Sequence, residues 1–338
     1  MDFNGIAGFI WSVADLLRGD YKQSDYGKVI LPFTLLRRLD CVLEPTKAAV
    51  LAEYKARKDS KLPLETFLPR KSGQSFYNTS ELDFTRLLAD SNNIKANLSA
   101  YITSFSENAR DIFERYEFQA QIERLDSAHL LYQIVQKFAS INLHPDLVDN
   151  HKMGLIFEEL IRRFSELSNE TAGEHFTPRE VIRLMVMLLF APDREALAVP
   201  GIVRSMYDPT AGTGGMLSVA DEYLSKLNEG ARLVMFGQEL NPESYAICKA
   251  DMLIKGQDVR NIIFGNTLSD DGHAGRNFDY MLSNPPFGVE WKKVEKAVRA
   301  EHERKVSYCP FAEKSGENVN LWVGSGHEHR AYDNHRTN

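Results

Sequence analysis

Apolar residues recur every three or four positions through roughly the first 165 residues of this chain, which is the spacing of one helix face. The pattern predicts helices at residues 6–17, 26–43, 47–58, 81–90, 92–106, 127–140 and 149–165. Pro32, inside the second of these, predicts a kink or a new helix start. Residues 60–80 are rich in Lys, Pro, Ser, Gly and Asn and predict a surface loop. Arg37 and Arg38 could touch phosphates, but an arginine pair on a helix is more often a solvated face.

The pattern changes after residue 170. Short apolar runs at 202–207, 233–239, 260–264 and 278–282 read as buried strands, and helical stretches at 181–190, 216–227 and 241–254 lie between them. This alternation predicts an α/β fold with a parallel, doubly wound sheet. We therefore expect a helical N-terminal domain over 1–165, a sheet domain over 166–305, and an atypical tail over 306–338. That tail lacks helical or strand periodicity, and we expect it to be disordered or irregular.

The block that precedes the first helix of the sheet domain predicts a helix start. Thr177 fits an N-cap, Pro178 the first helical position, and Glu180 the reciprocal partner of a capping box. This local explanation leaves Phe176 without a role, and it leaves open what lies at the positive end of the helix. His175 alone is no evidence of catalysis.

A Gly-rich turn joins the first strand to the next helix, in the sequence Asp208-Pro209-Thr210-Ala211-Gly212-Thr213-Gly214-Gly215. Strand, Gly-rich turn and helix make the first unit of a nucleotide-binding fold, where glycines let the backbone approach a ligand. The glycine spacing differs from the dinucleotide fingerprint, and no Lys follows as in a P-loop. A cofactor without a pyrophosphate is favoured. The alternative is a glycine turn that only allows close packing of strand and helix.

Two polar positions follow the next strands. Glu239 ends the second strand, where a carboxylate can accept hydrogen bonds from ribose hydroxyls. Asn266 lies in the turn after the third strand.

The fourth strand runs into Ser283-Asn284-Pro285-Pro286-Phe287-Gly288. Prolines supply no backbone N–H, so this turn presents one amide, bare carbonyls and an aromatic ring at the carboxyl end of a strand. Asn284 Oδ1 and the Pro285 carbonyl could accept the N–H groups of an exocyclic amine, and Phe287 could stack on its base. That arrangement suits methyl transfer to adenine. The alternative is a Pro-rich turn with Asn284 as a turn former.

Composition and charge limit the cellular compartment and the kind of DNA binding that we expect. The chain has 338 residues and a net charge of −7, whereas a protein that grips DNA alone is more often basic. Cys41, Cys248 and Cys309 are scattered, which fits a reducing cytoplasm and argues against a disulfide or zinc framework. The opening residues lack a signal-peptide pattern, and no apolar run is long enough to cross a bilayer.

Together these motifs resemble the modification subunit of type I restriction–modification systems, which are adenine-specific DNA methyltransferases that use S-adenosylmethionine. The resemblance covers the helical N-terminal part, including residues 25–32, and then 173–180, 208–215, Glu239, 265–268 and 284–287 in that order. It implies that the sheet domain is a Rossmann-like methyltransferase domain. It also implies double-stranded DNA as substrate, with a specificity subunit that reads the sequence and a restriction subunit that cleaves it.

The resemblance also assigns roles. Glu239 would bind the ribose, and Asn266 would lie near the adenine of the cofactor. The remaining cofactor contacts would come from Glu174, His175, Phe176, Thr177, Pro178, Arg179, Asp208, Gly212, Thr213, Gly214 and Gly215. The target adenine, flipped out of the duplex, would be held by Asn284, Pro285, Pro286 and Phe287.

The likeness continues through a helix expected at 289–305 and stops at about residue 306. Because the family sheet has further strands, we expect the catalytic domain to be incomplete and little activity from this chain alone. Two alternatives remain open: a methyltransferase acting on a protein glutamine amide, and a scaffold subunit without activity. His327, His329 and His335 could suggest a metal, but a disordered or out-of-frame tail explains them better.

Overall fold

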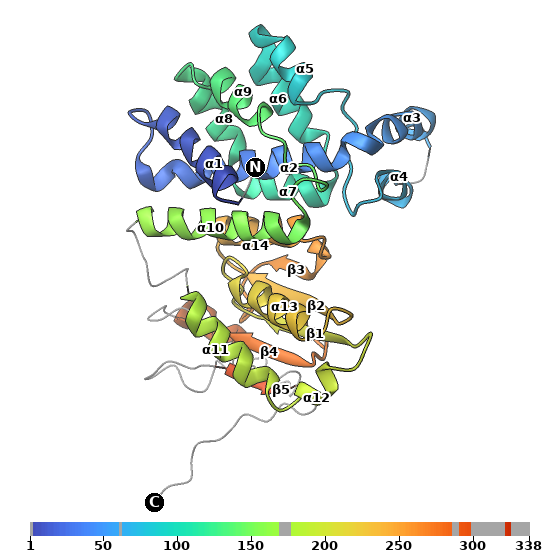
Figure 1. The fold of residues 1–338 in the computed structure, drawn as a ribbon, viewed down its shortest axis with the longest axis vertical. Coiled ribbons are helices and arrows are strands. Elements are labelled where there is room, and N and C mark those ends of the chain that lie inside the picture. Colours follow the sequence, from blue (N-terminus) through green and yellow to red (C-terminus); the bar gives the residue numbers. More distant parts are fainter. Residues whose placement is uncertain (1–2, 61–62, 169–176, 286–290, 299–321, 326–338) are drawn as a thin grey trace, which may run out of the picture. The chain divides into compact units, whose positions relative to one another are not determined.

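The computed structural model describes residues 3–60, 63–168, 177–285, 291–298 and 322–325 (Figure 1). The chain forms two compact units. The first comprises residues 1–172 with 249–259, and the second comprises 173–248 with 260–338. The second half of helix α14 (Pro242–Ile254) thus groups with the first unit. No described helix is both long and apolar enough to span a membrane.

The first unit is helical, as the apolar periodicity predicts. The predicted helices occur, and α4, α7 and α8 are additional helices that the pattern did not reveal. The helices are α1 (Phe3–Leu17), α2 (Tyr26–Leu43), α3 (Lys47–Arg57), α4 (Leu68–Ser72), α5 (Phe84–Ala89), α6 (Ile94–Thr103), α7 (Glu107–Arg115), α8 (Phe118–Ser127), α9 (Leu131–Ala139) and α10 (Asn150–Ser168).

Helix α2 is the central element of this unit. It packs against α1, α8, α9 and α10, and most of its side chains are buried. Phe33 stacks on Phe138 with ring centroids 5.3 Å apart and meets the edge of Phe118 at 4.9 Å. Such aromatic pairs stabilise beyond the area they bury. Pro32 starts no new helix, because α2 runs unbroken from Tyr26 to Leu43.

The prediction of a surface loop over residues 60–80 is wrong. Helix α4 lies there, and Phe67, Leu68 and Tyr77 pack with Val50 of α3 in a small core of their own. These apolar residues are too irregularly spaced among polar ones to give a period. Burial is decided here by packing against α3, which a local pattern does not reveal.

The view of Arg37 and Arg38 as a solvated face is also wrong. Arg38 is 1% exposed and donates to the carbonyl of Val148 and to Oδ1 of Asn150, both at 2.7 Å. Arg37 donates through Nε to the carbonyl of Ile141 at 2.9 Å. The two guanidinium groups satisfy carbonyls of the segment that leads into α10, so they are internal ties rather than phosphate contacts.

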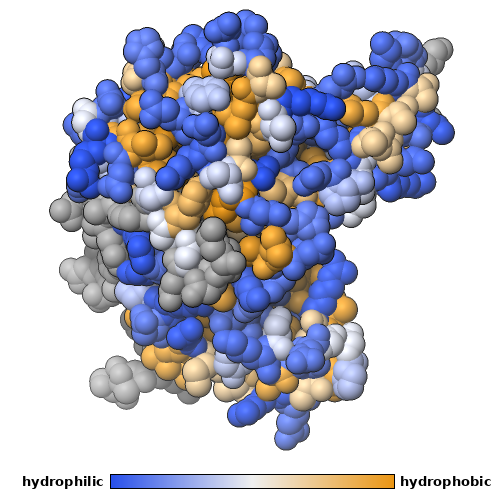
Figure 2. Space-filling view, turned by 45° about the horizontal axis from the view of Figure 1, so that its top comes forward, coloured by the Kyte–Doolittle hydropathy of each residue, from blue (hydrophilic) through white to orange (hydrophobic). Residues whose placement is uncertain are grey.

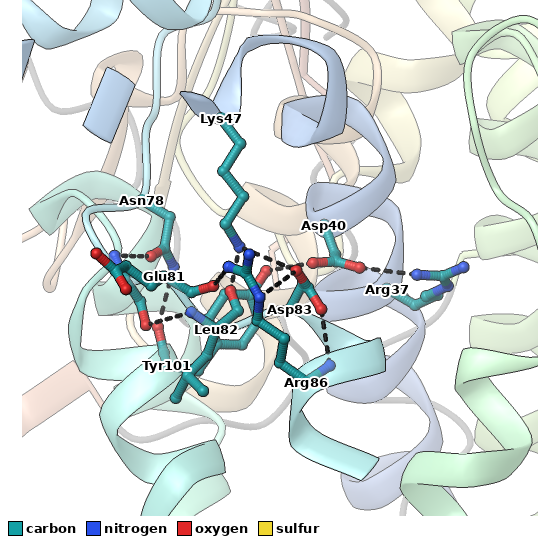
Figure 3. Close-up of polar contacts among 10 residues, drawn as sticks. Arg37, Asp40, Lys47, Asn78, Glu81, Leu82, Asp83, Arg86 and Tyr101 are labelled. Atoms are coloured by element: carbon teal, nitrogen blue, oxygen red, sulfur yellow. Dashed lines mark hydrogen bonds and ion pairs between the residues drawn. The ribbon is translucent and has the colours of Figure 1, made fainter. Parts of the chain in front are cut away.

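A polar cluster surrounds Asp40 within the helical core (Figure 3). Asp40 accepts hydrogen bonds from Arg37 at 2.7 Å and from the Tyr101 hydroxyl at 2.6 Å. Lys47 donates to the carbonyl of Leu82 and lies 3.9 Å from Asp83. Burial raises the pKa of Asp40, against the lowering effect of Tyr101 and Arg37. The carboxylate thereby joins α2 to α6 through Tyr101, while its other oxygen bonds to Arg37 within α2.

The second unit is built on a five-stranded sheet in the order β3-β2-β1-β4-β5, and the prediction of an α/β fold is confirmed. The first four strands are parallel. Its strands and helices are α11 (Arg179–Phe190), α12 (Arg194–Leu197), β1 (Val203–Asp208), α13 (Gly215–Leu227), β2 (Arg232–Glu239), α14, β3 (Ile262–Phe264), β4 (Tyr280–Ser283) and β5 (Trp322–Ser325).

Strand β1 lies at the centre of this sheet. It pairs with β2 at six positions, from Val203 to Asp208, and with β4 at two, Met206 and Tyr207. Below those two positions, Asp279 accepts from both the backbone N–H and the hydroxyl of Ser205, at 2.8 and 2.7 Å. The Asp279 side chain thus takes the place of backbone hydrogen bonds between β4 and β1 at this point.

Each face of the sheet has its own cover. Helix α13 packs on β1 and β2, and α11 packs beside it on β4 and β5 (Figure 1). Strand residues alternate between faces, so Tyr207 and Phe236 point away from these helices and pack with His273 and Phe278.

The visible surface is mostly hydrophilic (Figure 2). Helix α11 is an exception, with Val181, Leu184, Met187 and Leu188 exposed.

The tail differs from its prediction at one place. Residues 306–338 were expected to form no regular element, but β5 pairs antiparallel with β4 from Ser283↔Trp322 to Tyr280↔Ser325. Four residues are too few to show a period in the sequence. The strand conformation of this segment is instead determined by its pairing with the edge of β4. Residues 306–321 and 326–338, with His327, His329 and His335, lie outside the described residues. Of the helix expected at 289–305, the structure describes 291–298, which begin with the 3-10 turn Trp291–Val294.

Candidate cofactor and substrate site

The carboxyl ends of β1, β2 and β4 meet at one edge of the sheet. The chain runs from β1 outward through β2 and β3 and then returns to the other side of β1 as β4. This reversal creates a switch point between β1 and β4, where open α/β sheets bind ligands. The Gly-rich loop follows β1 and the Asn-Pro turn follows β4, so the two strongest motifs lie on the two sides of that point.

The Gly-rich loop has a backbone that requires glycine. Gly212 and Gly214 have φ values of +53° and +84°, which L side chains rarely adopt. A Cβ on Gly214 would also lie 2.8 Å from Sγ of Cys248. The packing alternative therefore explains Gly214, since α14 approaches the loop closely there. Gly212 faces a different partner, Glu239.

Glu239 holds the loop from the end of β2. One carboxylate oxygen accepts the backbone N–H of Gly212 at 2.8 Å, and the other accepts that of Asn241 at 2.7 Å. A carboxylate oxygen has two lone pairs, so each retains one acceptor site. Glu239 can therefore keep the loop in place and still accept bonds from ribose hydroxyls.

Asp208 ends β1 and is almost completely buried, at 2% exposure. It accepts the backbone N–H of Thr210 at 3.0 Å, and the side chain of Ser283 bonds to it as well. Burial raises the pKa of Asp208 to about 7, more than these bonds lower it, and the negative charge of Glu239 adds to the rise. Asp208 shapes the loop from beneath it.

A hydroxyl pair joins the two loops. Thr210 Oγ1 and Ser283 Oγ are 2.5 Å apart, and Ser283 immediately precedes Asn284. Thr267 Oγ1 adds a third link by donating to the carbonyl of Pro209 at 2.6 Å. Sequence reasoning missed these hydroxyls. The available signal was their position within two residues of Asp208, Asn266 and Asn284 at three strand ends.

Asn284 is half-buried, and its amide Nδ2 donates to Thr177 Oγ1 at 3.0 Å. The predicted N-cap is therefore wrong. Helix α11 begins at Arg179, one residue later than expected, Pro178 takes the cap position, and no side chain caps the helix. Thr177 is held instead by a residue 107 positions away. A local motif cannot reveal such a competing partner.

Arg179 and Asn266 bond within the protein. Arg179 pairs with Glu222 on α13, and Glu222 also binds Lys226 at 2.6 Å. Asn266 Oδ1 accepts the backbone N–H of Leu268 at 3.0 Å and thereby shapes the turn after β3. Their cofactor contacts stay predictions.

The remaining predicted residues divide into two groups. Thr213 lies within the Gly-rich loop, Gly215 begins α13, Pro178 precedes α11 and Pro285 follows Asn284; all four are at least partly exposed. Glu174, His175, Phe176, Pro286 and Phe287 lie outside the described residues. Across the part of the chain that the structure describes, no group of three or more His, Cys, Asp or Glu side chains could hold a metal ion.

Comparison with known families decides what this arrangement belongs to. The model of the N-6 DNA methylase family matches residues 148–326, more than half of the chain. The chain belongs to the N-6 DNA methylase family. A second model, of the HsdM N-terminal domain, matches residues 6–138 of the chain. The resemblance drawn from the motifs is confirmed.

Relatives and solved structures agree with this family. The chain is 26% identical over 303 residues to the type I restriction enzyme MjaIX methylase subunit of Methanocaldococcus jannaschii, covering 83% of this chain and 51% of the relative. It is 29% identical over 215 residues to the EcoEI methylase subunit of Escherichia coli, covering 61% and 41%. The chain thus spans about half the length of these relatives.

Among solved structures, the type I restriction–modification methyltransferase subunit of Streptococcus thermophilus shares the fold. Its TM-score is 0.63 at 24% identity, covering 86% of this chain and 65% of that one.

Proposed function

We propose that this chain provides the cofactor-binding and catalytic part of an adenine-specific DNA methyltransferase, the modification subunit of a type I restriction–modification system. One observation carries the proposal: the amide of Asn284 is held at the end of β4, across the switch point from the Gly-rich loop that Glu239 fixes. An amide acceptor beside a nucleotide-type loop suits transfer of a small group to an amine.

The residues at the loop fit S-adenosylmethionine. Glu239 retains acceptor sites for ribose hydroxyls, and the bent backbone at Gly212 and Gly214 leaves no side chain between loop and ligand. The loop contains no lysine that could bind a phosphate, which agrees with a cofactor that has no phosphate group. When bound, S-adenosylmethionine supplies an electrophilic methyl group.

Asn284 and Pro285 would act on the target amine. Its nitrogen lone pair is delocalised into the adenine ring, so the amine is a poor nucleophile. Hydrogen bonds from its two N–H groups to Asn284 Oδ1 and the Pro285 carbonyl favour a tetrahedral nitrogen with a localised lone pair. Asn284 Oδ1 and the Pro285 carbonyl would hold that lone pair toward the methyl group that bound S-adenosylmethionine would supply. One of these two acceptors would then direct the leaving N–H proton to solvent.

Partners follow from the same proposal. Double-stranded DNA would be the substrate, with a specificity subunit that reads its sequence and a restriction subunit in the same complex. A net charge of −7 gives little affinity of the chain itself for phosphates, which suits a subunit that depends on a partner for DNA. Because its substrate is genomic DNA of the cell, we place the protein in the cytoplasm.

Radiolabelled methyl transfer tests this function directly. The protein is incubated with labelled S-adenosylmethionine and duplex DNA, with and without the specificity subunit, and the modified base is identified by chromatography. We expect labelled N6-methyladenine when both subunits are present. Labelled glutamine in protein instead of adenine in DNA would contradict the proposal, as would a complex that binds DNA and cofactor but transfers no methyl group.

A further inference from the structure

The side chain of Asn284 has one hydrogen-bond partner among the described residues, the hydroxyl of Thr177. The two residues come from different parts of the second unit: Thr177 lies just before α11, and Asn284 just after β4. Both are half-buried, so they remain in reach of a ligand. The bond therefore does not belong to the packing of a hydrophobic core.

The main chain of Asn284 is fixed separately. Ser283 is buried, with 0% exposure, and its hydroxyl bonds to Thr210 and to Asp208 at the end of β1. With the preceding residue held in this way, rotation of the Asn284 side chain is the freedom that its own bond can restrict. The bond to Thr177 restricts that rotation.

The direction of the bond determines what the amide presents. Nδ2 is the donor end, and it is directed at Thr177 Oγ1. The carbonyl end, Oδ1, lies on the other branch of the same planar group and keeps its lone pairs for another donor. If the amide turned over, two acceptors would face each other unless the Thr177 hydroxyl also turned, and the NH₂ group would face the substrate.

We propose that Thr177 is a positioning residue for methyl transfer: its hydroxyl holds the Asn284 amide so that Oδ1 faces the target amine. The inference rests on the proposed function. It differs from the role that the family resemblance implies for Thr177, a contact with the cofactor. In our proposal Thr177 affects the chemical step through Asn284 and leaves cofactor affinity unchanged.

The two roles are separated by measuring kcat and cofactor affinity on the same variants. Thr177→Val keeps the shape of the side chain and removes the hydroxyl, whereas Thr177→Ser keeps the hydroxyl. Thr103→Val is a matched control, because Thr103 lies exposed at the end of α6 and its hydroxyl donates to the carbonyl of Ala100 in the preceding turn. Each variant is assayed in the complex with the specificity subunit, and S-adenosylmethionine binding is measured by calorimetry.

We expect Thr177→Val to lower kcat roughly tenfold, the effect of one lost hydrogen bond. The KM for DNA and the Kd for S-adenosylmethionine should stay within about twofold of the wild type, the scatter usual for variants that change no contact. Thr177→Ser should recover most of the wild-type kcat, and Thr103→Val should match the wild type.

Two results would overturn the inference. A weaker cofactor Kd with unchanged kcat would assign Thr177 to the cofactor, and wild-type values for Thr177→Val would show that the bond has no role. If Thr177→Val fails to fold, Thr177→Ala takes its place with the same criteria. A wild-type complex that methylates no DNA would refute the proposed function itself, a separate outcome from either of these.

Discussion

Each unit contains a buried aspartate whose pKa is raised by burial, and the two are satisfied in opposite ways. Asp40 in the helical unit has a cation, Arg37, and a phenol, Tyr101, as donors. Asp208 in the sheet unit has the backbone N–H of Thr210 and the hydroxyl of Ser283, neither of them charged. Burial opposes the charge of both carboxylates. The cation Arg37 lies beside Asp40 and partly offsets this effect, whereas the carboxylate of Glu239 adds to it at Asp208 beneath the Gly-rich loop.

Removing Asp40 should have the largest effect on folding. Asp40→Ala leaves the mostly buried Arg37 without its carboxylate, and loss of one partner of a buried pair costs about 3–5 kcal/mol. We expect the free energy of unfolding to fall by this amount in urea titrations followed by circular dichroism. Asp40→Asn keeps an acceptor for Tyr101 and should cost less. An Asp40→Ala protein as stable as the wild type would show that the cluster does not join α2 to α6.

Asp208 should make stability depend on pH. Its folded pKa of about 7 lies above the unfolded value, so the folded state holds a proton that the unfolded state has released. This contribution is complete below about pH 4 and is lost as the pH rises to about 7. The shift corresponds to a loss on the order of 4 kcal/mol.

Denaturation of wild type and Asp208→Asn at pH 5 and pH 7.5 measures this dependence. The variant should lose much less stability between the two values, because its amide does not titrate. Equal losses in both proteins would mean that Asp208 titrates near its ordinary pKa.

Replacing Asn284 should separate chemistry from binding. Asn284→Ala removes the acceptor proposed for the target amine, and loss of one such group costs about 10²–10³ in kcat. The Kd for S-adenosylmethionine should not change. Methyl transfer by the complex and calorimetry measure the two effects. The control is Asn97→Ala on α6, where Asn97 is half-buried and donates to Asp90. Transfer at the wild-type rate would remove Asn284 from the reaction.

Replacing Glu239 should have the opposite profile and a smaller effect. Glu239→Ala removes the proposed ribose acceptor and the bond to the N–H of Gly212, and one hydrogen bond to a charged group contributes roughly 1.5–3 kcal/mol. Calorimetry should show weaker binding of S-adenosylmethionine by that amount. Glu239→Gln, which keeps an acceptor, should lose less. Unchanged affinity in Glu239→Ala would take this residue out of the cofactor site.

The sequence predicted elements well where a long period or an alternation existed. The helix at 26–43 and the four parallel strands were found because their burial repeats over many residues. Segments 60–80 and 322–325 were misread because their burial depends on contact with distant elements, the core around Val50 and the edge of β4. The prediction of a solvated face for Arg37 and Arg38 was wrong for the same reason, since their carbonyl partners lie about a hundred positions away in the sequence.

The candidate site shows the same limit. Strand ends can be read from sequence, so Asp208, Glu239 and Asn284 were identified as positions at one edge of a sheet. The hydroxyls that connect them were not, because Ser and Thr have many local partners to choose from. Thr177 is the clearest case: a complete local motif explained it, and a bond to Asn284 prevails in the fold.

The unequal pairing of β1 has a consequence for motion. Six paired positions hold β1 to β2, whereas two paired positions and the bonds between Asp279 and Ser205 hold β1 to β4. Local openings start where the fewest backbone bonds must break, so β4 should separate from β1 more often than β2 does. Amide hydrogens of β4 should then exchange with solvent faster than those of β1 and β2. Each opening would move Asn284 away from the site and leave the Gly-rich loop with Glu239 in place. The proposed binding site for the base would therefore be lost before the proposed binding site for the cofactor.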